Sequence, residues 1–195
     1  IFHVCFSLAR ASGWSVAPSA NQGVKSAANA STRRVVLRTL TAFVTLDPQA
    51  PLLHEDVLEE AIDKLVVAKT IFEKGVPAAA KDSRVTVRTL RIVTQNFPAY
   101  LDPEKRSQAF TSVAKLHRFA HEKTDALNVP VMISIGSLPV ASQIHTPDYV
   151  ALQRELLVQY PSVFSSMEVT QNGEVNAIAV QNAAGTMAHL RDNHA

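Results

Sequence analysis

Polar residues follow several apolar segments of the sequence at the point where each segment ends. Asp47 follows the first of these segments, Gln95 and Asn96 the second, Ser137 the third and Glu168 a fourth. Two carboxylates among amide and hydroxyl groups have the chemistry for proton transfer or for holding a divalent ion. Asp and Asn also start turns by bonding to their own backbone, which is the alternative for each residue taken singly. We treat the five as candidate ligand-binding residues.

Two histidines, His117 and His121, stand four residues apart, a spacing at which both side chains share a helix face and can chelate zinc. The run HRFAH lacks the glutamate that follows the first histidine in zinc proteases. We therefore interpret the pair as one half-buried and one surface histidine. No metal site is predicted, since a metal-dependent hydrolase needs more ligands than we can place.

Glycine motifs that mark cofactor and nucleophile sites do not occur in the sequence. Its six glycines form neither GxGxxG nor GxxxxGKS/T, which argues against Rossmann dinucleotide and P-loop nucleotide sites. The absence of GxSxG disfavours an α/β-hydrolase. Catalytic residues and cofactors therefore stay unassigned.

An internal repeat indicates how these residues are positioned. Residues 34–48 (RVVLRTLTAFVTLDP) and 84–98 (RVTVRTLRIVTQNFP) align at an offset of 50, and both are rich in β-branched residues before a turn with proline. A helical pattern lies between them, with apolar residues at three- and four-residue steps over residues 55–74. Strand, helix and repeated strand are typical of stacked β-α units. The identical positions are Arg34/Arg84, Val35/Val85, Arg38/Arg88, Thr39/Thr89, Leu40/Leu90 and Pro48/Pro98.

The remaining sequence continues this alternation. Asn172-Gly173 is a strong hairpin signal near the end of the chain. The whole pattern predicts an α/β fold, with repeated β-α units forming a mostly parallel sheet or half of an α/β barrel and a β-hairpin near residues 162–180. The predicted strands are 34–46, 84–94, 130–136, 162–169 and 174–180, and the predicted helices are 55–74, 103–124, 147–159 and a last one from about 182.

Three arginines fall inside predicted strands, where lone charges are unusual. Arg38 and Arg88 are equivalent in the repeat, and Arg91 follows shortly after. We expect them to pair with helix acids such as Glu59 or Asp63. The alternative is that they point into a barrel toward an anionic ligand.

Composition excludes several classes of protein. Net charge is +2, and no acid occurs before Asp47, so the later part of the chain is mildly acidic and nucleic-acid binding is not expected. No apolar run is long enough for a membrane span. The single Cys5 excludes an internal disulfide and favours a reducing, cytoplasmic compartment.

The first part of the chain differs in composition from the rest. Residues 1–33 are rich in Ala, Ser and Asn and contain no acid, which is typical of a disordered leader or a transit peptide. A transit peptide would place the protein in a mitochondrion or another organelle. We expect residues 34–195 to be the N-terminal, incomplete part of an α/β barrel domain.

The segment VRTLRIVTQNFPAYLD (residues 87–102) resembles proteins that carry domain of unknown function 711. The earlier RTLTAFVTLDP and IFEKG segments and the later SIGSLP segment extend the resemblance over roughly residues 33–195. It implies an α/β barrel related to glycyl-radical enzymes such as pyruvate formate-lyase, in a family whose activity is not established. Radical chemistry is not expected, because residues 34–195 contain no cysteine.

These observations lead to two expectations about function. The first is an enzyme-like barrel that binds a small polar or anionic metabolite at the carboxyl ends of its strands. The alternative is a catalytically silent structural or assembly subunit that retains the barrel wall. A homo-oligomer is compatible with either, because an open half-barrel exposes strand edges.

Overall fold

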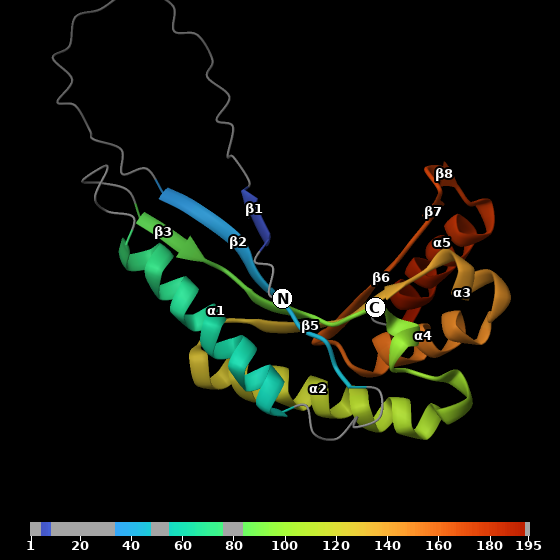
Figure 1. The fold of residues 1–195 in the computed structure, drawn as a ribbon, viewed down its shortest axis with the longest axis horizontal. Coiled ribbons are helices and arrows are strands. Elements are labelled where there is room, and N and C mark those ends of the chain that lie inside the picture. Colours follow the sequence, from blue (N-terminus) through green and yellow to red (C-terminus); the bar gives the residue numbers. More distant parts are fainter. Residues whose placement is uncertain (1–4, 9–33, 48–54, 76–83, 194–195) are drawn as a thin grey trace, which may run out of the picture.

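The computed structural model describes residues 5–8, 34–47, 55–75 and 84–193. Strands and helices alternate along this part of the chain (Figure 1). The elements are β1 (Cys5–Leu8), β2 (Arg34–Phe43), α1 (Glu55–Gly75), β3 (Arg84–Val87), β4 (Leu90–Val93), η2 (Phe97–Ala99), η3 (Pro103–Lys105), α2 (Arg106–Leu127), β5 (Val131–Leu138), α3 (Val140–His145), α4 (Asp148–Gln159), β6 (Val163–Met167), β7 (Thr170–Gln171), β8 (Glu174–Val175) and α5 (Ala177–Asn193).

The two repeated segments pair with each other in the sheet, and equivalent residues of the repeat lie opposite each other. β2 runs parallel to β3 and β4, with Val35 opposite Val85 and Leu40 opposite Leu90, which is the offset of 50 residues seen in the sequence. The repeated strand is interrupted between β3 and β4. Backbone hydrogen bonds carry the pairing across the gap, from Arg88 N to Leu37 O and from Leu40 N to Thr89 O, both at 3.0 Å.

The strand order confirms the predicted α/β class and favours a barrel wall over an open doubly wound sheet. The path β2-β4-β5-β6 follows chain order without a reversal, and these pairs are parallel. Right-handed crossovers in one direction place the connecting helices on one face. In Figure 1 the sheet curves, with α1 and α2 along its convex side, so the fold is a half-barrel.

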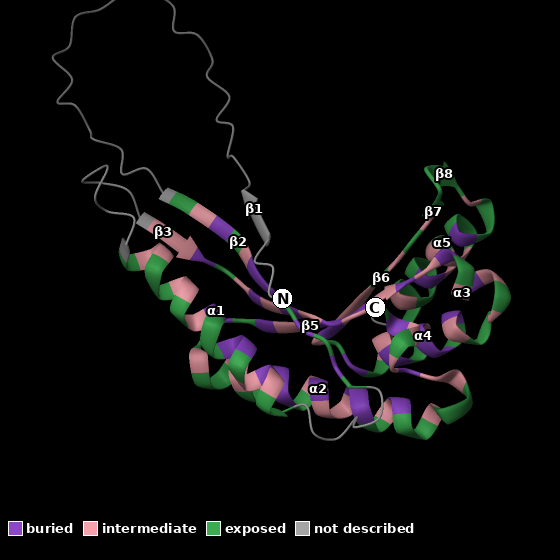
Figure 2. Cartoon of the chain, in the orientation of Figure 1, coloured by how far each residue is buried: buried purple, intermediate pink, exposed green. Residues whose placement is uncertain are grey.

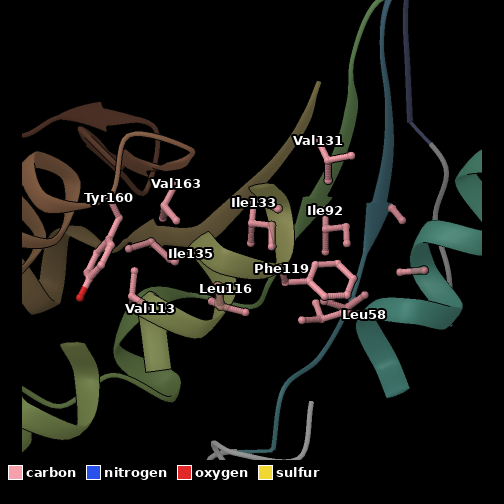
Figure 3. Packing of buried hydrophobic residues seen from close by; sticks show 14 of the residues in the cluster. Leu58, Ile92, Val113, Leu116, Phe119, Val131, Ile133, Ile135, Tyr160 and Val163 are labelled. Carbon is pink, nitrogen blue, oxygen red and sulfur yellow. The ribbon is translucent and has the colours of Figure 1, made fainter. Parts of the chain in front are cut away.

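Alternating apolar residues of the strands form the core against those helices. Val131, Ile133 and Ile135 of β5 are buried and face α2, from which Leu116 and Phe119 pack against the sheet (Figure 3). Burial follows the same arrangement, since buried positions lie between sheet and helices and exposed ones on the outer helix surfaces (Figure 2).

The predicted hairpin is confirmed, although its arms are short. β7 and β8 pair antiparallel around Asn172 and Gly173, whose φ angles are 55° and 84°. Positive φ at both central residues is the geometry that an Asn-Gly hairpin turn requires.

The predicted strand over 174–180 is wrong beyond Val175, because a helix begins there instead. The Asn176 side chain accepts a hydrogen bond from Ala179 N at 3.0 Å and caps α5, which starts before the predicted residue 182. The short helix α3 was not predicted. The predicted helix 147–159 is found as α4, and the predicted helix 103–124 as η3 followed by α2.

The structure bears on two further expectations, which concern the leader and membrane spans. Residues 5–8 of the predicted leader pair antiparallel with β2, whereas residues 9–33 lie outside the described part of the chain. Among the described helices, none combines the length and the apolar character that crossing a membrane requires.

Candidate functional site

Three of the five predicted site residues meet at the carboxyl ends of neighbouring strands. Ser137, near the end of β5, lies between Asn96 after β4 and Glu168 after β6. The Ser137 hydroxyl is 2.8 Å from Asn96 Oδ1 and 3.1 Å from Glu168 Oε1. Asn96 and Glu168 are exposed and Ser137 is half-buried, so the network is open to solvent.

The hydroxyl has one proton, so it donates to one of these two oxygens at a time. Rotating the side-chain amide of Asn96 so that Oδ1 and Nδ2 exchange places makes Nδ2 the donor to the Ser137 hydroxyl. The hydroxyl then donates its own proton to Glu168. That arrangement gives a directed chain from amide to hydroxyl to carboxylate. Its free groups are an amide oxygen and a carboxylate oxygen, which suit a ligand that presents hydrogen-bond donors.

A bulge in β5 orients Ser137. The register between β5 and β6 shifts between Ser134 and Ser137, and Gly136 has a φ of 80°. A Cβ at Gly136 would lie 1.9 Å from the carbonyl oxygen of Gln95, so only glycine fits against the neighbouring strand. The Ser165 hydroxyl donates to Gly136 O at 2.6 Å and holds the bulge from the other side. Bulges of this kind redirect side chains next to binding sites.

Gln95, a further predicted site residue, stabilises the strand ends instead. Its Nε2 donates to Leu46 O at 2.6 Å, and its Oε1 accepts from Leu46 N at 2.8 Å, which imitates one step of a β ladder. Asp47 follows Leu46 as an exposed residue and stays a predicted ligand residue. The structure therefore assembles Asn96, Ser137 and Glu168, and gives Gln95 a backbone role.

Two buried glutamines that the sequence reasoning missed hold the same edge from the helix side. Gln143 of α3 donates to Leu138 O at 3.0 Å and to Glu168 O at 2.8 Å. Gln153 of α4 donates to the Ser165 hydroxyl at 2.7 Å. A signal was present in the sequence, because each glutamine lies among apolar residues of a helix. The bond from Gln143 and the bond from Glu168 N to Leu138 O at 3.0 Å fix the backbone of Glu168, whereas Gln153 holds β6 at Ser165 and Ser166.

Directly after β4, the buried Thr94 and the half-buried Tyr100 form a polar contact. The Thr94 hydroxyl lies 3.1 Å from Ser134 O and 2.9 Å from the Tyr100 hydroxyl. Burial raises the pKa of Tyr100 well above its usual range, so the phenol stays protonated. The loop after Asn96 also lines a cavity of about 300 Å³, which Lys105 and Tyr149 border.

The histidine pair is as predicted, with His117 half-buried and His121 exposed. His117 Nδ1 contacts the Ser162 hydroxyl, and its ring lies 5.6 Å from that of Tyr160. Burial, and secondly the nearby His121, lower the pKa of His117. No group of three or more metal-ligating side chains occurs in the described segments.

The predicted pairing of strand arginines with Glu59 is wrong, because Glu59 pairs with Lys123 at 2.6 Å. Arg91 alternates with the buried Leu90 and Ile92 and so lies on the face of the sheet away from the helices. Its guanidinium stacks on Phe164 at 4.4 Å. Its buried Nε has no hydrogen-bond partner among the described residues.

Comparisons with known proteins add no relative. No protein-family profile, curated protein or solved structure matches the chain.

Proposed function

We propose that the protein binds a small polar metabolite at the carboxyl ends of strands β4, β5 and β6. The observation that carries the proposal is the bridge from Ser137 to Asn96 and Glu168, which joins three strands by side chains alone. In barrel-type α/β folds, ligands bind at this end of the strands. The bulge at Gly136 and the tethers from Gln143 support a site held in one geometry.

The chemistry of the site favours a ligand with hydrogen-bond donors, such as hydroxyl or ammonium groups. Glu168 contributes a negative charge, and no basic side chain hydrogen-bonds to the Ser137 network among the described residues. This refines the expected polar or anionic ligand toward the polar class. Glu168 is also the ionisable group of the network, so we assign to it any proton transfer to or from the bound ligand.

The experiment is a thermal-shift screen with polyols, amines, organic acids and divalent ions on the whole chain. A ligand that binds only the folded state raises the melting temperature. The proposal expects stabilisation by a polyol or an amine, and loss of that shift in Glu168→Gln. Glu174→Gln, an exposed carboxylate on the hairpin, is the matched control and keeps the shift.

The second candidate is a structural or assembly subunit that retains the barrel wall. It is supported by the exposure of Phe43 on the sheet, where 39% of the residue is open to solvent. A flat screen on a well-folded chain, together with a concentration-dependent mass in sedimentation, favours this second candidate and contradicts the first.

We also propose membership of the family carrying domain of unknown function 711. The support is the run Arg91–Pro98 together with the sequential strand order that such a barrel requires. We propose a cytoplasmic location because the chain has a single cysteine. The alternative is an organelle, which the composition of residues 1–33 favours. Locating a tagged, full-length protein in cells decides between the two.

A further inference from the structure

A second cavity lies between α3, α4 and α5, on the helix side of the molecule. Its volume is about 350 Å³, within the range of small-molecule sites. Figure 1 shows the three helices gathered at the β6 end of the sheet. The lining combines apolar residues with three polar ones: Ile144, Val150, Ile178, Gln143, Arg154 and Asn182.

Gln143 contributes a buried acceptor that is not used. Only 2% of the residue is exposed, and both of its hydrogen bonds within the described residues are donated by Nε2, to Leu138 O and Glu168 O. These two carbonyls fix the orientation of the amide, because an oxygen facing them would be repelled. Oε1 is left buried with no partner among the described residues, although a buried acceptor normally has one.

Arg154 contributes a charge that no carboxylate neutralises within the described chain. Its Nε donates to the Thr186 hydroxyl at 2.9 Å and its Nη2 to Asn182 O at 3.2 Å. Both acceptors are neutral, and the guanidinium has three further N–H groups. Gly185 makes room for it, since a Cβ there would lie 2.8 Å from Nη2. The neighbouring Glu155 pairs with Arg106 instead.

We propose that this cavity binds a short carboxylic acid with a hydroxyl or ammonium group beside the carboxylate. Arg154 pairs with the carboxylate, for which a guanidinium has matching geometry. Gln143 Oε1 accepts from the hydroxyl or ammonium group. Ile144, Val150 and Ile178 contact a short alkyl chain.

The test is calorimetric titration of the whole chain with α-hydroxyisocaproate and two analogues that each lack one group. Isocaproate lacks the donor for Gln143, and α-hydroxyisocaproamide lacks the charge for Arg154. Each omission weakens binding roughly tenfold or more, because a hydrogen bond to a buried or charged group is lost. Absence of binding by α-hydroxyisocaproate, or equal binding of all three compounds, overturns the proposal.

Variants locate the binding. Arg154→Gln weakens it at least roughly tenfold, whereas Arg118→Gln, an exposed arginine of α2, leaves it unchanged. Because Arg154 also joins α4 to α5, Ala151→Phe serves as a second variant that fills the cavity from an exposed position and abolishes binding. Unchanged binding in Ala151→Phe overturns the proposal. Glu168→Gln leaves this binding intact, so the two proposed sites fail or succeed separately.

Discussion

Replacing Gly136 with alanine places a methyl group against the backbone of the neighbouring strand. The added Cβ would lie 1.9 Å from Gln95 O and 2.7 Å from Gln95 C, and neither atom can rotate away. Positive φ alone costs an L-residue about 1–2 kcal/mol, and forcing backbone apart adds about 1–3 kcal/mol. We therefore expect Gly136→Ala to lower the free energy of unfolding by about 2–5 kcal/mol, a large share of a typical domain's stability of about 5–15 kcal/mol.

Gly173→Ala is the matched control for this prediction. Gly173 has almost the same φ, 84° against 80°, but nothing lies within 4 Å of an added Cβ. It therefore carries the conformational cost without the clash. Urea unfolding followed by circular dichroism compares the two, and Gly136→Ala is expected to shift the midpoint by about 1–2 M at an unchanged slope. Equal midpoints for the two variants would refute the close approach of β4 and β5.

Three further predictions concern stability. Burial, and secondly the neighbouring imidazole, lower the pKa of His117, so the unfolded chain binds the proton more readily. The free energy of unfolding should fall as pH drops below about 6.5, and His117→Asn should reduce that slope in urea titrations at several pH values. Thr94→Val removes a buried hydroxyl that bonds to Tyr100 and should cost about 1–3 kcal/mol, whereas Thr111→Val, on the exposed surface of α2, should cost little. Burial acts to raise the pKa of Glu73, but bonds to a lysine and to a strand amide hold it below its usual range. Glu73→Gln should therefore destabilise the protein at neutral pH, and its difference from wild type should shrink as pH falls below about 4.3; a constant difference in unfolding midpoints contradicts this.

The parallel sheet was predictable because two segments that pair in it repeat each other in sequence. Two segments that share residues at a fixed offset pair in that register, as Leu40 and Leu90 do. The end of the chain was harder to predict, because Val175 to Val180 is rich in β-branched residues. A cap from Asn176 and packing on α4 override that local preference.

The candidate site was predictable as an edge of the sheet but not as a set of contacts. Residues at the carboxyl ends of neighbouring parallel strands must converge, and the structure brings Asn96, Ser137 and Glu168 together, while their binding of a ligand stays a prediction. Whether a side chain faces the ligand or the backbone depends on loop geometry, and Gln95 turned to Leu46. The roles of Gly136 and Gln143 depend on distances between strands and helices that no local pattern contains.

We propose that a ligand binds where Asn96, Ser137 and Glu168 meet. The most direct measurement is a map of backbone amide chemical shifts during titration with the compound that gives the largest stabilisation in the screen. We expect the largest changes at the ends of β4, β5 and β6, and their loss in Glu168→Gln. Changes confined to other parts of the chain, with none at these strand ends, would contradict it.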